Sequence, residues 1–211
     1  MNWFDKLTLL ATGLTAIYLI VRFIIDYRGK DTKPTQNIYY IISFAVLLVS
    51  GLLLIAFGWG ALANPLVAVV ATLIPLGLSV GLVTEFYQKY AKGYLIFSLI
   101  GLVVILITRF APVGGFAIFV YALVHSIAGL LVFFLPILAT KAKKAPGGLI
   151  MVTVGGFLIG VGGIALAFLK AGVAILSAET ILAILAPLLL LMTLAYTWGF
   201  VKNIKAGYAG K

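Results

Sequence analysis

Residues 115–138 read GFAIFVYALVHSIAGLLVFFLPIL, a run without a single Asp, Glu, Lys or Arg. The hydrocarbon core of a bilayer is about 30 Å thick, and a helix needs roughly 20 apolar residues to cross it. Six further runs of comparable character occur in the chain: residues 6–27, 37–58, 64–86, 93–111, 148–170 and 178–201. The sequence therefore predicts an all-α integral membrane protein with seven transmembrane helices.

The overall composition supports the same fold class. Of the 211 residues, 64% are hydrophobic and 9% are charged, whereas about a quarter of the residues in a typical soluble domain are charged. The segments between the runs are too short to fold alone, so we expect residues 1–211 to form one transmembrane domain in contact with the lipid bilayer. The formal net charge is +10, but the basic residues lie in short loops and not on one soluble face. We therefore expect no nucleic-acid partner.

The distribution of Lys and Arg predicts the orientation of the chain. One side of the predicted bundle receives twelve basic residues: Arg22, Arg28, Lys30, Lys33, Lys89, Lys92, Lys141, Lys143, Lys144, Lys202, Lys205 and Lys211. The other side receives three: Lys6, Arg109 and Lys170. Because basic loops stay in the cytoplasm, we predict that the N-terminus lies outside and the C-terminus inside. We expect the chain to be an integral protein of the cytoplasmic membrane of a prokaryote.

Four pairs of residues are separated by the same 112 positions: Pro34 and Pro146, Pro75 and Pro187, Gly51 and Gly163, and Gly60 and Gly172. This offset maps the first three runs onto the last three in the same orientation. It gives candidate repeats over 6–92 and 115–205, with the fourth run as a linker. Parallel repeats of this kind occur in transporters. The alternative is that the shared spacing arose by chance, because glycine is common in this chain.

In this 3+1+3 layout the chain resembles the SWEET sugar transporters and the seven-helix opsins. The resemblance covers the number and order of the spans. The Pro-Gln pair of the PQ-loop family does not occur in the sequence, and run 178–201 contains no Lys that could carry a retinal Schiff base. The resemblance therefore implies a layout of helices and assigns no functional residues.

His125 is the only histidine of the chain and lies near the middle of run 115–138. Of the four residues three or four positions away, three are small, and small residues let a neighbouring helix approach closely. We therefore expect His125 to face the bundle as a neutral imidazole. Together with Tyr121 and Ser126 it forms a candidate buried polar or ligand-binding group.

Two roles for His125 are open at this point. The first is structural, an interhelical hydrogen bond to one of the polar groups expected at similar depth: Thr72, Ser79, Ser98 or a carbonyl freed by Pro75 or Pro187. The second is functional, with the imidazole lining a ligand or cofactor pocket or acting as an axial ligand.

Two prolines and one charge cluster are further candidates for function. Pro75 and Pro187 each remove an intrahelical hydrogen bond and should kink a span, so they are candidate hinges.

Arg109, Lys170 and Glu179 are predicted to lie at the outer surface, where they form either a solvated cluster or the mouth of a binding site. Ser177 is predicted to cap the last helix, with Glu179 in its first turn.

Small residues recur along run 148–170 at spacings of four, three and four: Gly156, Gly160, Gly163 and Ala167. These spacings place them on one face of a helix. Several glycines on one face suggest a close helix–helix contact, either within the bundle or with another chain. We therefore predict that this stripe is a packing surface.

The chemistry that the sequence lacks limits the choice of function. The chain has no cysteine and none of the nucleophile, zinc or nucleotide motifs of soluble enzymes. Its acidic residues all fall near the ends of the runs: Asp5, Asp26, Asp31, Glu85 and Glu179. We therefore expect no enzymatic activity, no cofactor and no metal.

Two hypotheses for function follow, and an intramembrane enzyme is a distant third. The first is an accessory or scaffold subunit that packs against other membrane subunits or copies of itself. The alternative is a small-solute transporter or channel built from two three-helix repeats.

Overall fold

The computed structural model describes residues 1–111, 113–170 and 176–207 and is all-helical over these residues. Its elements are α1 (Trp3–Arg28), α2 (Gln36–Phe57), η1 (Gly58–Ala63), α3 (Pro65–Ala71), α4 (Leu73–Phe86), α5 (Gln88–Phe110), α6 (Gly115–Lys141), η2 (Gly147–Leu149), α7 (Ile150–Lys170) and α8 (Ala178–Ala206). These elements provide seven segments long and apolar enough to cross a membrane, with α3 and α4 together forming the third. The predicted all-α fold with seven helical segments long and apolar enough to span a membrane is confirmed.

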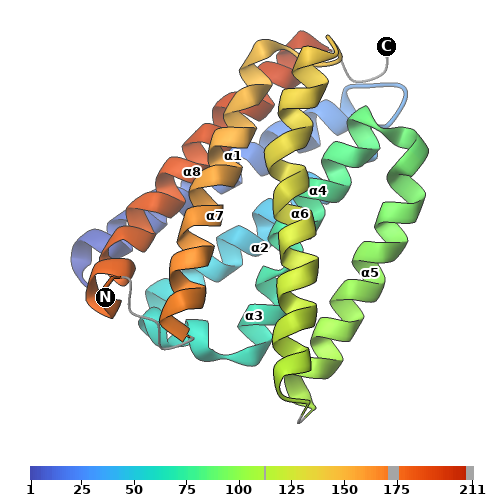
Figure 1. The fold of residues 1–211 in the computed structure, drawn as a ribbon. Coiled ribbons are helices and arrows are strands. Elements are labelled where there is room, and N and C mark those ends of the chain that lie inside the picture. Colours follow the sequence, from blue (N-terminus) through green and yellow to red (C-terminus); the bar gives the residue numbers. More distant parts are fainter. Residues whose placement is uncertain (112, 171–175, 208–211) are drawn as a thin grey trace.

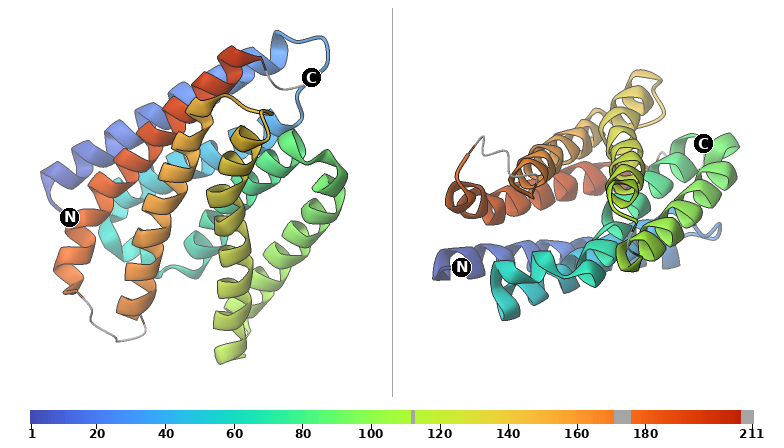
Figure 2. Two further views of the ribbon diagram at one scale, coloured as in Figure 1. Left: turned by 45° about the horizontal axis from the view of Figure 1, so that its top comes forward. Right: turned by 60° about the horizontal axis from the view of Figure 1, so that its bottom comes forward.

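Six of the spans form a ring (Figures 1 and 2). Going round it, α1 packs against α2, α2 against α4, α4 against α6, α6 against α7, α7 against α8, and α8 against α1. The remaining span, α5, lies outside the ring and packs against α4 and α6. The chain therefore contains two groups of three spans, α1–α4 and α6–α8, which meet at α1–α8 and at α4–α6.

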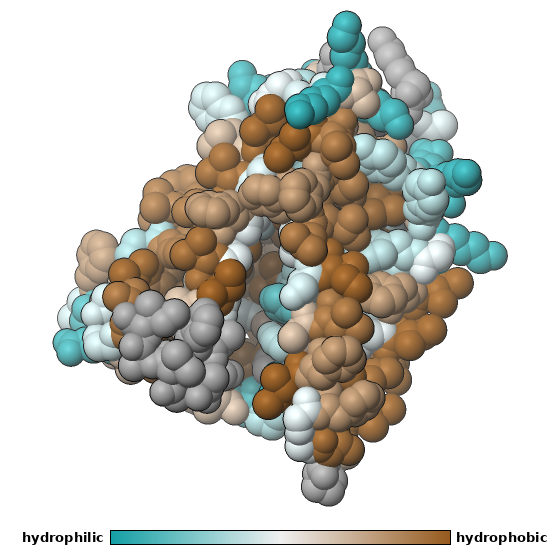
Figure 3. Space-filling view, viewed as in Figure 1, coloured by the Kyte–Doolittle hydropathy of each residue, from teal (hydrophilic) through white to brown (hydrophobic). Residues whose placement is uncertain are grey.

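The two ends of the bundle differ in polarity. The helices α1, α4, α6 and α8 all end at one end, which is called the lysine-rich end below because most of the basic residues lie there. Figure 3 shows hydrophilic side chains gathered at that end and apolar side chains over most of the remaining face. An apolar outer surface is what lipid contact requires, because lipid tails offer no hydrogen bonds.

Buried aromatic rings hold the two groups of spans together near the lysine-rich end. Phe200 of α8 packs against Phe23 of α1, with ring centroids 5.4 Å apart, and against Tyr40 of α2, with centroids 4.7 Å apart. Phe44 and Tyr196 extend the same cluster. All five rings are almost completely buried. This aromatic cluster packs directly against the polar side chains at the lysine-rich end.

Pro75 and Pro187 have different effects on their helices. α3 ends at Ala71, four residues before Pro75, and α4 begins at Leu73. Pro75 has no N–H to donate to the Ala71 carbonyl, and its ring crowds that carbonyl. The break in the third span follows from this proline. By contrast, α8 continues as one helix through Pro187.

The ends of the first and last helices are capped by side chains. Asn2 and Asp5 form a reciprocal capping box at the start of α1, with the Asp5 N–H donating to Asn2 Oδ1 at 2.8 Å. At the start of α8, Ser177 Oγ accepts from the Thr180 N–H at 3.1 Å, and Glu179 lies in the first turn. The predicted cap of the last helix is confirmed.

Candidate functional site

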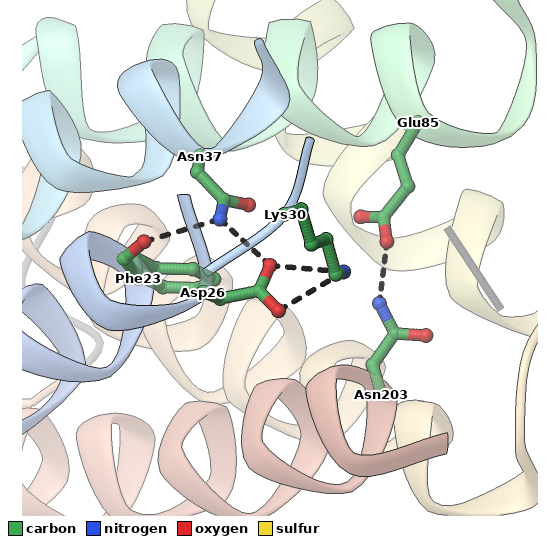
Figure 4. Close-up of polar contacts among 6 residues, drawn as sticks. All are labelled: Phe23, Asp26, Lys30, Asn37, Glu85 and Asn203. Atoms are coloured by element: carbon green, nitrogen blue, oxygen red, sulfur yellow. Dashed lines mark hydrogen bonds and ion pairs between the residues drawn. The ribbon is translucent and has the colours of Figure 1, made fainter. Parts of the chain in front are cut away.

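A cluster of polar and charged side chains, buried or partly buried, lies where the two groups of spans meet at the lysine-rich end. It is called the polar network. Its members are Asp26 of α1, Lys30 just after α1, Asn37 and Tyr40 of α2, Glu85 of α4 and Asn203 of α8. Figure 4 shows most of these residues and the contacts among them. Together with Phe23, Gln36 and Ile204 they line a small cavity of about 10 Å³, which is about the space that one water molecule needs.

Glu85 is at the centre of the first half of the polar network. The Tyr40 hydroxyl donates to Glu85 Oε2 at 2.7 Å, and Asn203 Nδ2 donates to Glu85 Oε1 at 2.6 Å. Hydrogen bonds to an ionised carboxylate are short and about twice as strong as neutral ones. The carboxylate thus joins three helices, and its bond to Asn203 crosses from one group of spans to the other.

Asp26 is at the centre of the second half. Its carboxylate pairs with the Lys30 ammonium at 2.9 Å and accepts from Asn37 Nδ2 at 2.9 Å. The same Asn37 nitrogen also donates to the Phe23 carbonyl at 3.2 Å. The Asp26–Lys30 pair is the one salt bridge within the described residues.

Helical periodicity explains why these residues meet. On α2, the buried face runs through Phe44, Tyr40 and Asn37. On α8, it runs through Tyr196, Phe200 and Asn203. Spacings of three and four residues keep each set on one face, so each polar residue lies one turn beyond an aromatic residue of the core.

The sequence analysis missed the polar network because it placed the acidic residues by depth alone. Glu85 lies near the end of its span, as expected, but its carboxylate points into the bundle. The signal was available, because extending the buried face of α4 from Leu78 through Leu82 reaches Glu85 at spacings of four and three. Depth identifies which residues are near a surface, whereas the helical face decides which of them are turned inward.

The structure brings two of the three residues proposed around His125 together. The Tyr121 and His125 rings stack with centroids 5.1 Å apart, and the Arg109 guanidinium carbon lies 4.7 Å from the Tyr121 centroid. Ser126 is exposed. The hydrogen bond expected of His125 is not made by its Nδ1, which is buried without a partner among the described residues.

The remaining predicted sites are only partly brought together. Arg109 contacts Tyr121, while Glu179 is exposed in the first turn of α8. The side chains of Lys170 and Ala167 lie outside what the structure describes. Of the two candidate hinges, Pro75 accompanies a break between helices and Pro187 lies inside a continuous helix.

The small-residue stripe of α7 divides into a packed part and an open part. A Cβ on Gly156 would lie 3.1 Å from Val132 of α6, and the Thr153 hydroxyl donates to the Phe133 carbonyl at 2.7 Å. A Cβ on Gly160 or Gly163 would meet nothing within 4 Å. α6 and α7 are therefore in close contact toward the lysine-rich end and apart toward the opposite end.

Figure 3 shows the resulting hollow between α6 and α7, with hydrophilic side chains inside it. The bundle is thus closed by the polar network at one end and hollowed on this face toward the other.

Comparison with known proteins finds no matching family model, no matching curated protein and no matching solved structure.

Proposed function

We propose that the chain is a small-solute transporter in which the α1–α4 group and the α6–α8 group move relative to each other, with α5 outside them. The observation that supports this most is the hydrogen bond from Asn203 on α8 to Glu85 on α4. It joins the two groups at the lysine-rich end, where a transporter in this conformation would be closed.

The opposite end supports the same proposal. There α6 and α7 separate, and the space beside Gly160 and Gly163 is open. This space lies within the α6–α8 group, where it offers a solute a route into the bundle, whereas movement of one group against the other would occur at the α1–α8 and α4–α6 contacts. The break between α3 and α4 is a further point at which one group can change shape.

The cost of the polar network also supports a function beyond packing. Charged side chains within a membrane bundle are expensive, and they usually mark ion or solute pathways. A purely structural contact between α4 and α8 could be made by apolar residues at lower cost. A hydrogen bond between Glu85 and Asn203 can instead break and re-form as the groups separate.

The test is a pair of distance measurements by double electron–electron resonance. The chain has no native cysteine, so two introduced cysteines carry the only spin labels. One pair, Ile38→Cys and Lys202→Cys, spans the groups at the lysine-rich end. A second pair, Leu7→Cys and Phe119→Cys, spans them at the opposite end; all four positions are exposed. Asn203→Ala should lengthen the first distance and shorten the second, because loss of the bond favours opening at the lysine-rich end.

The matched control is Thr197→Ala, also on α8, whose hydroxyl donates to the Thr193 carbonyl of the same helix. It should leave both distances unchanged. Glu85→Gln keeps the size of the side chain and provides a second test if Asn203→Ala does not fold. Distances that stay the same in both Asn203→Ala and Glu85→Gln would contradict the transporter proposal.

A scaffold subunit is the second candidate, and the open part of the α7 stripe favours it. A Cβ on Gly160 or Gly163 would meet nothing within 4 Å, and flat glycine surfaces favour contact with another helix. Native mass measurement after mild detergent extraction tests this candidate. Stable association with other chains or copies supports it, and a lone monomer contradicts it.

A further inference from the structure

Arg109, Tyr121 and His125 form a continuous series of contacts at the end of the bundle opposite the lysine-rich end. The Arg109 guanidinium lies over the Tyr121 ring, and that ring stacks on the His125 imidazole at an interplanar angle of 24°. Arg109 comes from the last turn of α5, and the two rings lie one turn apart on α6. This set is called the Arg–Tyr–His stack below.

Two nitrogens of the stack lack partners. Arg109 Nε and His125 Nδ1 are both buried, and neither has a hydrogen-bond partner in the part of the chain that the structure describes. Buried polar atoms without partners are uncommon in folded proteins. The Arg109 charge is also unbalanced there, since the one salt bridge among the described residues joins Lys30 and Asp26. The stack therefore presents positive charge and unused hydrogen-bonding capacity.

The stack also connects the surface with the interior of the bundle. Arg109 is the penultimate residue of α5. His125 is ten residues into α6, which corresponds to roughly 15 Å along the helix axis at 1.5 Å per residue. Beside Tyr121 lies Thr72, directly before the start of α4.

We propose that an oxyanion binds at the Arg–Tyr–His stack, where Arg109 supplies the positive charge and the His125 imidazole supplies further hydrogen-bonding capacity. The ligand carries a carboxylate or phosphate group, whose oxygens accept hydrogen bonds from a guanidinium or from an imidazole N–H. That group can belong to a free solute or to the headgroup of an anionic lipid. The site stands on its own contacts, so it does not depend on transport by the chain.

The test uses the fact that His125 is the only histidine. In protein labelled with ¹⁵N-histidine, both imidazole resonances come from this residue. We titrate the full chain in phosphatidylcholine nanodiscs with sodium acetate and, separately, with inorganic phosphate. A saturable shift of the His125 resonances is the expected result for a free anion. Arg109→Gln should weaken the binding about tenfold or more, because a charge-assisted hydrogen bond and the site's positive charge are both lost.

A second arm detects a lipid source. In nanodiscs that contain phosphatidylglycerol, the His125 resonances should differ from those in phosphatidylcholine, and native mass spectrometry should show retained phosphatidylglycerol that Arg109→Gln loses. A response in the first arm assigns a free anion, and a response in the second arm alone assigns a lipid headgroup. Either response supports the oxyanion site.

The matched control is Arg22→Gln, because Arg22 Nε is likewise buried without a partner but belongs to α1. It removes the same charge and should leave the His125 response unchanged. Arg109→Lys, which keeps the charge but loses the planar donor set, should bind with intermediate affinity. The proposal is overturned by the absence of a His125 response in both arms, or by equal effects of Arg22→Gln and Arg109→Gln.

Discussion

At the scale of single residues, the tightest helix contacts occur at individual glycines. A Cβ on Gly77 of α4 would collide with Ser43 Oγ and lie 2.9 Å from the Tyr39 carbonyl oxygen of α2. A Cβ on Gly81, one turn along, would collide with the Tyr40 ring. The sequence draws attention to the glycines of α7 because they recur there. It could not rank them against Gly77, because spacing shows which residues share a face and not how closely a neighbour approaches.

Gly77→Ala should therefore destabilise the protein by about 1–3 kcal/mol, the usual cost of forcing extra volume into a packed contact. Gly129→Ala is the matched control, since a Cβ there meets nothing within 4 Å and the residue also lies within a helix. This control should be neutral or stabilising by up to about 1 kcal/mol, because alanine favours helix more than glycine does. The free energy of unfolding in detergent measures both. A Gly77→Ala variant as stable as the control would show that α2 and α4 separate without cost.

At the scale of helices, hydropathy predicted the existence of each span better than its ends. α5 begins at Gln88, although the apolar run begins near residue 93, because the polar residues before it continue the helix. α8 likewise extends to Ala206. Apolar length reports the part of a helix inside the lipid, whereas polar turns beyond the bilayer leave no hydropathy signal. The break before Pro75 was predictable from the missing N–H of proline, but the continuity of α8 through Pro187 was not.

The small-residue stripe of α7 predicts that leucine substitutions at two neighbouring glycines will differ in their effect on stability. Gly156→Leu should weaken the contact with Val132 and the backbone of Phe133 on α6, and it should destabilise the chain by about 1–3 kcal/mol. Gly160→Leu adds the same side chain one turn away, where a Cβ has open space. It should leave the unfolding free energy of the isolated chain nearly unchanged. Unfolding in detergent measures this difference, and equal destabilisation by the two variants would mean that α6 and α7 are in contact along their full length.

At the scale of the whole molecule, the ring of six spans is compatible with the proposed repeat. The offset of 112 positions relates α1 to α6, α2 to α7, and α4 to α8. Each contact in the ring then has a counterpart: α1–α2 with α6–α7, α2–α4 with α7–α8, and α1–α8 with α6–α4. The polar network has no such counterpart, because Glu85 corresponds to Thr197 in this offset. The duplication remains a prediction. The spacing between prolines could not indicate that only the first of the two candidate repeats carries a residue such as Glu85.

The orientation of the bundle is the last prediction, and it rests on the sequence, which assigns twelve basic residues to one side of the bundle and three to the other. Because positively charged loops resist translocation, we expect the lysine-rich end in the cytoplasm. Lys143→Cys lies at that end and Gly115→Cys at the other, and both positions are exposed. A membrane-impermeant maleimide should label Gly115→Cys in intact cells and Lys143→Cys only after the membrane is opened. The native chain, which has no cysteine, provides the unlabelled background. The reverse pattern would place the polar network at the outer surface and the Arg–Tyr–His stack at the cytoplasmic one.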